Sequence, residues 1–363
     1  MKRIAIIGAG ACGMLLAGLL NEEFDVTLLE KNNKLGKKIL ASGNGKCNFT
    51  NNGNYNNKYN NEFAIDIVSR YNHKYLLEYF TKLGLMYRED DEHRVYPLSE
   101  CSSTIVDVLK TKLKGVKILL DSKVKKIEDC DNGIRVYYND TLDVFDFVVC
   151  TSGSSASNLG SEYAYNYLKD YGLSFVDVSS SLTPIKIDKD LSFISGVRVK
   201  CLVKLYRDNE FVYEEKGEVL FKEDYLSGIV IYNISSMINR DKNAKYEIKL
   251  DLLSDSINDI DGDSLVGVLH PKLIEFYKGY KIENFKDLSF KVISFKDIKE
   301  AQVASGGINI EEVNSDLSLK RNNKIYIGGE VLDCDGMCGG YNLQFAFSCA
   351  FVINESLLKK TMK

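Results

Sequence analysis

The chain has 363 residues, which is longer than one ordinary domain, so we expect two or three compact units. Hydrophobic residues make up 45% and charged residues 27%, a globular composition with enough apolar side chains for a sizeable core. The net charge is −4 and the acids and bases are interspersed, which excludes the concentrated basic stripe of a nucleic-acid-binding surface. We therefore expect no nucleic-acid partner, and the composition gives no indication of the oligomeric state.

The cysteines and histidines indicate a compartment and argue against a metal site. Nine cysteines are scattered from Cys12 to Cys349 without a CxxC framework, the pattern of reduced thiols in a cytoplasmic protein. The three histidines, His73, His93 and His270, do not stand at metal-ligand spacing from a cysteine or from one another. We therefore expect no bound metal.

The N-terminal apolar run Ile4–Leu20 has two interpretations. After two basic residues it resembles a signal peptide, but Gly8, Gly10 and Gly13 interrupt it where a signal helix would be continuous. A short strand, a tight turn and a helix explain the same residues better. No other segment approaches the roughly 20 apolar residues of a membrane span, so we expect a cytoplasmic protein without a membrane partner.

The first elements in chain order form a βαβ unit. Ile4–Ile7 suits a buried parallel strand, Gly10–Leu20 has an apolar helical face, and Val26–Leu29 is a second buried strand. The polar, glycine-rich segment Lys31–Asn61 follows. A loop of this length is uncommon in a compact domain and is usually functional.

The remaining elements change character near Leu182–Pro184. Before this point we expect helices at Glu62–Tyr71, Lys74–Leu83 and Ser103–Leu113, and strands at Lys117–Leu120, Lys123–Asp129, Ile134–Tyr138 and Asp143–Val149, the last three antiparallel. After it we expect strands at Val197–Tyr206, Glu210–Tyr213, Glu218–Phe221, Tyr246–Leu250, Ser289–Phe295 and Gln302–Ile310, with helices at Ser227–Asn239 and Ser264–Tyr280. The last predicted elements are a buried parallel strand at Lys324–Ile327 and a helix at Asn342–Leu358. The simplest organisation is a discontinuous α/β nucleotide-binding domain made from both ends of the chain, with a β-barrel-like and partly helical insertion.

The strongest local signal is a GxGxxG motif between a predicted strand and a predicted helix, formed by Gly8, Ala9, Gly10, Ala11, Cys12 and Gly13. Gly8 permits the tight turn, Gly10 lets the backbone approach a pyrophosphate, and Gly13 allows close packing of helix and strand. The helix N-terminus presents free N–H groups to the phosphates. Glu30 lies twenty residues beyond Gly10, where a carboxylate accepts hydrogen bonds from ribose hydroxyls, which favours FAD or NAD over NADP. The alternative is a glycine-rich turn that binds nothing.

Further glycine-rich segments are candidates for ligand contact. Leu35–Asn48 contains three glycines and three lysines. Dense glycine indicates backbone close to a ligand and the lysines could meet phosphates, whereas the alternative is a flexible basic surface loop. Gly328–Glu330 resembles a strand end that meets a ligand, and Gly339–Asn342 resembles a second helix N-terminus. Either could also be an ordinary strand or helix boundary.

Together these motifs resemble the BaiN/YhiN-type family of FAD-dependent oxidoreductases, also described as aminoacetone-oxidase-like flavoproteins. The likeness covers essentially the whole chain and includes the N-terminal glycine motif, Lys38–Asn52, Thr151–Gly153, Gly217–Leu220, Ser305–Ile308 and Gly328–Gln344. It implies an α/β fold in which a discontinuous Rossmann-like FAD-binding domain (1–183 and 311–363) carries an inserted β-barrel-like domain (184–235 and 286–310) and a small helical domain (236–285).

The resemblance also implies which residues bind FAD. The pyrophosphate would lie on Gly8–Gly13 and the adenosine ribose on Glu30, and Lys31 and Lys38 are also cofactor-binding residues. The other implied contacts are Ser42, Gly43, Lys46, Cys47 and Asn48 along the flavin, Thr151 and Gly153 near the middle of the cofactor, Gly329 and Glu330 at the ribityl-phosphate region, and Asn342 and Leu343 at the pyrimidine edge of the isoalloxazine. A helix N-terminus at that edge is favourable because negative charge builds there when flavin is reduced.

The chain departs from the family pattern at two places. Lys46 stands where the family usually has arginine, which weakens any bidentate contact, and Ser315–Lys320 replaces a threonine-rich phrase whose contacts are therefore not carried over. Cys47 is a candidate catalytic residue because it lies in the flavin-side segment, but a small packed thiol is the favoured interpretation. Cys334 and Cys338 do not have CxxC spacing, so we expect no flavin–disulfide relay.

The sequence indicates the class of reaction but no catalytic side chain, because hydride chemistry belongs to the flavin. No second GxGxxG follows a strand beyond residue 150, so NADH or NADPH would dock transiently, or the substrate would reduce the flavin directly. The resemblance implies NAD(P)H-dependent reduction of an activated C=C bond in a small organic substrate, which we favour, or oxidation of a small amine with oxygen. A flavin-binding sensor or scaffold without turnover and a colourless NAD-dependent dehydrogenase are the remaining alternatives.

Overall fold

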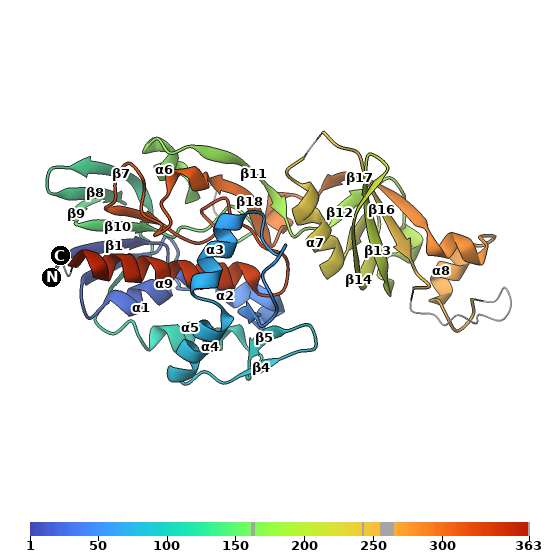
Figure 1. Ribbon diagram of the computed structural model, residues 1–363, viewed down its shortest axis with the longest axis horizontal. Coiled ribbons are helices and arrows are strands. Elements are labelled where there is room, and N and C mark those ends of the chain that lie inside the picture. Colours follow the sequence, from blue (N-terminus) through green and yellow to red (C-terminus); the bar gives the residue numbers. More distant parts are fainter. Residues whose placement is uncertain (161–163, 242, 255–264, 362–363) are drawn as a thin grey trace. The chain divides into compact units, whose positions relative to one another are not determined.

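The computed structural model describes residues 1–160, 164–241, 243–254 and 265–361 of the chain (Figure 1). The chain divides into two compact units. Met1–Val178 and Val303–Lys363 form unit 1, and Ser179–Gln302 form unit 2. Unit 1 is therefore built from two separate parts of the chain, and unit 2 is inserted between them.

A five-stranded parallel sheet forms the centre of unit 1. Its order is β19-β10-β1-β2-β6, with bounds Arg3–Ile7 (β1), Asp25–Leu29 (β2), Lys117–Leu119 (β6), Phe147–Cys150 (β10) and Ile325–Ile327 (β19). β10 and β19 are buried throughout, as is usual for strands of a parallel sheet. Helices α1 (Ala11–Leu20) and α9 (Tyr341–Thr361) pack against each other (Figure 1). The predicted Rossmann-like α/β fold is confirmed.

Smaller sheets and short helices complete unit 1. One sheet contains β7 (Val124–Cys130), β8 (Gly133–Tyr138) and β9 (Thr141–Phe145), and another contains β3 (Thr50–Asn51), β5 (Arg94–Pro97) and β4 (Tyr87–Glu89). The short helices are α2 (Lys37–Ala41), α3 (Glu62–Arg70), α4 (His73–Lys82), α5 (Ser102–Lys110) and α6 (Asn166–Asp170). β11 (Phe175–Ser181) pairs with β18 (Val303–Ile308). β18 is therefore not a barrel strand, although the resemblance places 286–310 in the barrel.

The prediction of one antiparallel strand at Asp143–Val149 is wrong. The chain leaves the antiparallel sheet at Phe145 and enters the parallel sheet at Phe147. Asp146 marks the change, because its carboxylate accepts a hydrogen bond from the backbone N–H of Arg3 at 2.7 Å and its own N–H donates to the Arg3 carbonyl at 2.9 Å. This contact joins residues far apart in sequence, so a local pattern does not contain it.

Unit 2 contains a closed six-stranded antiparallel barrel. Its order is β12-β15-β14-β13-β16-β17, with bounds Ile185–Ile187 (β12), Arg198–Arg207 (β13), Glu210–Lys222 (β14), Tyr225–Ser227 (β15), Tyr246–Asp251 (β16) and Leu288–Phe295 (β17). Alternate side chains of β13, namely Cys201, Val203 and Leu205, are buried in a core shared with Phe221. Two helices accompany the strands, α7 (Ile229–Ile238) and α8 (Pro271–Phe276). The predicted β-barrel insertion is confirmed.

The structure differs from the expectations for this region in three respects. Glu210–Tyr213 and Glu218–Phe221 belong to one strand, β14, because the residues between them remain paired with β13. Tyr246–Asp251 is a barrel strand inside the range 236–285 that the resemblance assigns to a helical domain. The predicted helix Ser264–Tyr280 starts outside the described residues, and its described part contains the short helix α8.

Three properties of the described residues bear on function. No helix among them is long and apolar enough to cross a membrane. They also contain no group of three or more His, Cys, Asp or Glu side chains arranged to hold a metal ion. All nine cysteines are free thiols.

Candidate functional site

The glycine motif forms the turn between β1 and α1. Gly8 has a φ of 106°, and a Cβ there would lie 2.5 Å from the carbonyl oxygen of Thr151. A Cβ at Gly13 would lie 1.9 Å from the carbonyl oxygen of Gly8, so both positions require glycine. A Cβ at Gly10 would meet no heavy atom within 4 Å. The turn is therefore tight against the protein on one side and open at Gly10, where a pyrophosphate can approach.

Gly10 is also the N-cap of α1, and no side chain caps this helix end. The first N–H groups of a helix have no partner within the helix and carry partial positive charge. An anion beside Gly10 would therefore meet N–H donors that no capping side chain occupies. This is the arrangement by which helix N-termini bind phosphate groups.

Glu30 follows directly after β2 and is a buried carboxylate beside the glycine turn. Only 7% of its surface is exposed. Its Oε2 accepts a hydrogen bond from the backbone N–H of Ala9 at 2.8 Å, and its Oε1 accepts from the backbone N–H and the side-chain Nδ2 of Asn32 at 2.9 and 2.6 Å. A carboxylate has about four lone-pair positions, so one on Oε2 is left for a further hydroxyl donor. This geometry fits a ribose at Glu30.

A small cavity lies against Glu30 at the carboxyl ends of β1 and β2. It is lined by Ile7, Gly8, Leu29, Glu30, Lys31, Ser122, Lys123, Val124, Ser152, Ala164 and Tyr167. The backbone N–H of Ser122 donates to the Glu30 carbonyl at 2.8 Å, which brings the start of β7 to this place. Sequence reasoning missed Ser122, Lys123, Val124, Ala164 and Tyr167, because no local motif marks them.

Lys38 and Glu330, both predicted cofactor contacts, form an ion pair. The Lys38 Nζ lies 2.5 Å from Glu330 Oε2 and 3.1 Å from the Ser154 Oγ, and Glu330 Oε1 accepts from the backbone N–H of Ala304 at 3.3 Å. A Cβ at Gly153 would lie 4.0 Å from the Lys38 Nζ. The structure therefore brings together predicted residues from α2 and from the loops after β10 and β19.

Two more residues of these loops hold the site together. The Thr151 hydroxyl donates a hydrogen bond to the Gly8 carbonyl at 2.8 Å. The Thr151 side chain therefore faces the glycine turn and holds it in place. A Cβ at Gly329, where φ is 79°, would lie 3.6 Å from the Cβ of Cys12.

Tyr165, which sequence reasoning missed, is a buried residue near Ser154 and Glu330. It is 3% exposed, and burial raises its pKa. A raised pKa means that this hydroxyl is neutral.

The predicted flavin-side segment is a strained loop after α2. Gly43, Asn44, Gly45 and Cys47 have φ values of 54°, 53°, 83° and 57°. A Cβ at Gly43 would lie 2.8 Å from the backbone N of Asn48, so glycine is required there. Left-handed backbone at non-glycine residues is strained and is common at functional sites.

Two side chains of the segment Ser42–Asn48 make hydrogen bonds to the backbone, and a third is a buried thiol. Ser42 donates to the carbonyl of Ile39 at 2.7 Å, and Asn48 donates to the Thr50 and Val95 carbonyls at 2.9 and 3.0 Å. The Cys47 side chain is fully buried, and this burial raises its pKa to about 12.

Lys46 differs from the other predicted residues, because its Nζ pairs with the exposed Glu100 at 2.8 Å. Lys46 is therefore not brought to the polar cluster around Lys38.

The N-terminus of α9 packs against the strand that follows this segment. A Cβ at Gly340, where φ is 94°, would lie 2.5 Å from the Thr50 carbonyl oxygen, and Asn51 donates to the Gly339 carbonyl at 2.9 Å. The side-chain Nδ2 of Asn342 donates to the Gly336 carbonyl at 2.7 Å, and its Oδ1 accepts from the backbone N–H of Gly336 at 2.9 Å. The predicted flavin-side residues and the predicted Asn342–Leu343 pair therefore belong to two segments in direct contact.

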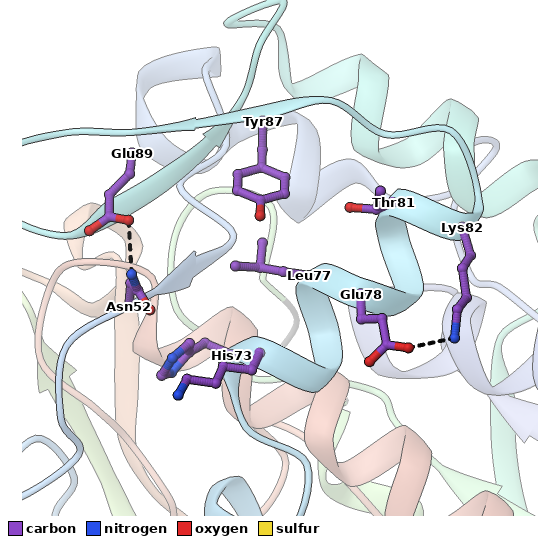
Figure 2. Close-up of a pocket in the computed structure, with 9 residues that line it drawn as sticks. Asn52, His73, Leu77, Glu78, Thr81, Lys82, Tyr87 and Glu89 are labelled. Atoms are coloured by element: carbon purple, nitrogen blue, oxygen red, sulfur yellow. Dashed lines mark hydrogen bonds and ion pairs between the residues drawn. The ribbon is translucent and has the colours of Figure 1, made fainter.

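A second cavity lies between α4 and β4 (Figure 2). The ring of Tyr87 faces Leu77 across it, and Asn52 donates to Glu89 at 2.9 Å. At one end, His73 Nδ1 is 2.9 Å from the Tyr55 hydroxyl, and burial lowers the pKa of His73. None of the predicted cofactor residues lines this cavity, so it is not part of the site described above.

A family model described as HI0933-like protein Rossmann domain matches residues 2–356. The 3-dehydro-bile acid delta(4,6)-reductase of Clostridium scindens is 27% identical, over 99% of this chain and 100% of its own. Proteins named ribosomal RNA dihydrouridine synthase, from Haemophilus influenzae and Escherichia coli, are each 27% identical, over 98% and 97% of this chain and the same shares of their own. Because the family model spans nearly the whole chain, the protein belongs to the HI0933-like family of FAD-dependent oxidoreductases, the BaiN/YhiN-type flavoproteins that its motifs resemble.

Proposed function

We propose that the protein reduces a carbon–carbon double bond conjugated with a carbonyl group, with NADH or NADPH as a transient electron donor. The names of its relatives support this reaction. A 3-dehydro-bile acid delta(4,6)-reductase is named for ring double bonds in a molecule that also carries a ketone. Dihydrouridine differs from uridine by saturation of the ring double bond beside a carbonyl. The two substrates differ, but the bond that is reduced belongs to one chemical class.

The observation that carries the cofactor assignment is an open glycine beside a buried carboxylate. Gly10 leaves space for a pyrophosphate at an uncapped helix end, and Glu30 has one acceptor position left for a ribose hydroxyl. FAD supplies the hydride chemistry when it is bound. Lys38 and Glu330 would hold its middle part, and the cavity lined by Ser122 and Tyr167 would receive the adenine.

The flavin end would lie along the loop Ser42–Asn48 and the N-terminus of α9. The α9 end would favour the negative charge that develops on a reduced flavin. Cys47 would pack beside this end as a protonated thiol and would not act as a nucleophile, because burial raises its pKa to about 12. No protein side chain is assigned to proton transfer.

For the substrate we propose a small organic molecule first, in line with the interspersed surface charges of the chain. A uridine in ribosomal RNA is the second candidate, and the names of two relatives favour it. Oxidation of a small amine with oxygen is the competing reaction within the family resemblance.

The experiment starts with an absorbance spectrum of the purified protein and anaerobic addition of NADH or NADPH. We expect flavin bands that bleach with one of these donors. The reduced protein is then mixed with a steroid dienone or, separately, with ribosomal RNA from cells that lack this protein, and flavin reoxidation and product mass are followed. Saturation of either substrate, a gain of two hydrogens, supports the reductase and selects the substrate. Flavin that neither nicotinamide reduces, but a small amine does, would replace the proposal with the oxidase.

A further inference from the structure

We propose that Asn32 is a positioning residue for the adenosine end of the cofactor. In this proposal Asn32 holds the Glu30 carboxylate in the orientation that binds the ribose, and Lys37 holds Asn32. The proposal rests on the FAD site proposed above and adds two residues to it, Asn32 and Lys37.

The contacts of Glu30 define what Asn32 does. Both hydrogen bonds to Glu30 Oε1 come from Asn32, from its backbone N–H at 2.9 Å and from its side-chain Nδ2 at 2.6 Å. Glu30 Oε2 receives one hydrogen bond, from the backbone N–H of Ala9 at 2.8 Å. Oε1 is therefore saturated, and the free acceptor position lies on Oε2, the oxygen on the side of the glycine turn. The Asn32 amide thus selects which carboxylate oxygen is available to the ribose.

Lys37 determines which way the Asn32 amide points. Its Nζ lies 3.4 Å from Asn32 Oδ1, and an ammonium group can donate only to the oxygen end of an amide. The Nδ2 end must then face Glu30. Lys37 is the first residue of α2 and the neighbour of Lys38, whose Nζ lies 2.5 Å from Glu330. One turn of helix therefore reaches both the adenosine end and the middle of the proposed cofactor site.

The backbone around Asn32 is held independently of its side chain. The N–H of Asp121 donates to the Asn32 carbonyl at 3.1 Å, and the N–H of Ser122 donates to the Glu30 carbonyl at 2.8 Å. These bonds remain when the Asn32 side chain is changed. A variant at Asn32 should therefore alter the orientation of the Glu30 carboxylate without unfolding the loop.

The test compares Asn32→Ala and Asn32→Asp with matched variants of the exposed neighbour, Asn33→Ala and Asn33→Asp. Dissociation constants of the cofactor-free protein are measured for FAD, for ADP, which contains the adenosine and the diphosphate but no flavin, and for riboflavin, which lacks both. We expect Asn32→Ala to raise the FAD and ADP constants by about tenfold, the usual effect of losing one hydrogen bond to a charged group. Asn32→Asp should raise both further because it places a second negative charge beside Glu30. Lys37→Met should raise both by roughly threefold, since it releases the amide without removing it.

Several outcomes would overturn the proposal. The first is that Asn32→Ala binds ADP as tightly as the wild type does. The second is that Asn32→Ala loses as much affinity for riboflavin as for ADP. The third is that Asn32→Asp and Asn33→Asp change the FAD and ADP dissociation constants equally. A lower unfolding temperature of cofactor-free Asn32→Ala, accompanied by equal losses of ADP and riboflavin affinity, would also do so, since it would indicate a merely structural role. Failure of the proposed reaction looks different, because it would appear as no nicotinamide-dependent bleaching in the wild-type protein saturated with FAD. Wild-type protein that binds neither FAD nor ADP would overturn both proposals.

Discussion

The Lys38 Nζ lies 2.5 Å from the Glu330 carboxylate, although 292 positions separate the two residues in sequence. The pair joins α2 to the loop after β19, the last strand of the central sheet. Both side chains are partly buried, with 31% and 19% of their surfaces exposed. Exposed ion pairs contribute little to the free energy of unfolding, whereas disruption of a buried pair is costly. We expect the contribution of this partly buried pair to be intermediate.

Breaking this pair should lower the stability of the cofactor-free protein. We expect Lys38→Met and Glu330→Gln each to reduce the free energy of unfolding by about 1–2 kcal/mol. The double variant should lose less than the sum, because either single change already removes the contact. Urea unfolding of the four proteins gives the coupling energy, with Lys34→Met, at an exposed lysine of the same segment, as the control. Strictly additive losses would show that the two side chains do not interact.

The glycine motif predicts a separation between stability and cofactor affinity. Alanine at Gly13 would place its Cβ 1.9 Å from the Gly8 carbonyl oxygen, so Gly13→Ala should destabilise the cofactor-free protein by about 3 kcal/mol. Gly10 has φ −86° and ψ −161°, which alanine adopts without strain, and a Cβ there meets no atom of the protein. We therefore expect Gly10→Ala to unfold like the wild type and to bind FAD at least tenfold more weakly. Urea unfolding and FAD titration check this, and wild-type FAD affinity in Gly10→Ala would place the pyrophosphate elsewhere.

The parts of this site that the sequence predicts are local. Gly8–Gly13 and Glu30 lie within one βαβ unit, where strand, turn and helix have fixed spacings, so their roles follow from periodicity and glycine chemistry. The cavity residues Ser122 and Tyr167 lie beside Glu30 only because separate strands and loops meet at one sheet edge. No pattern in the linear sequence marks that meeting. The same holds for Asn32, whose role depends on a rotamer and on a lysine five positions later.

The errors in the predicted strands have a similar origin. Asp143–Val149 is apolar enough for one strand, and its division between two sheets depends on the contact of Asp146 with the Arg3 backbone. In the barrel, Glu214–Gly217 is polar, a pattern that predicts an interruption of the strand. It continues β14 because Cys201–Lys204 of β13 pairs with it along the whole stretch. Pairing across the sheet thus overrides the local propensity of polar residues.

The cysteines should differ sharply in reactivity. Cys101 is exposed, and hydrogen bonds from the Ser103 side chain and backbone lower its pKa, whereas burial raises the pKa of Cys47 to about 12. Because the thiolate is the reactive form, iodoacetamide at pH 8 should modify Cys101 first and leave Cys47 unmodified in the folded protein. Mass spectrometry of peptides checks the order. Lower pH should slow modification of Cys101, because it reduces the thiolate fraction.

Cys47→Ala should retain the rate of flavin bleaching by the active nicotinamide within about twofold, since a protonated, packed thiol takes no part in hydride transfer. The rate is measured by anaerobic stopped flow at saturating FAD. Cys101→Ala serves as the control for loss of a thiol elsewhere. A rate reduced a hundredfold in Cys47→Ala alone, with normal FAD affinity, would make Cys47 a catalytic residue.

Asp316 should make the stability of the protein depend on pH. It lies in the stretch Ser315–Lys320, and it accepts hydrogen bonds from the Ser318 hydroxyl at 2.6 Å and the Ser356 hydroxyl of α9 at 2.7 Å. Burial alone would raise the pKa of Asp316, but these hydrogen bonds outweigh it and lower the pKa below its usual value of 3.8.

A carboxyl group whose pKa is lower in the folded protein stabilises it above the unfolded-state pKa, and this contribution is lost as pH falls through the folded-state pKa. We therefore expect Asp316→Asn to be less stable than the wild type by about 1–3 kcal/mol at pH 7 and at pH 5, with the difference shrinking below about pH 4. Urea unfolding at pH 7, 5 and 3 measures the difference, and Asp91→Asn, at an exposed carboxylate, is the control. A difference that stays constant down to pH 3 would mean that shape, and not the charge of Asp316, holds α9 at this position.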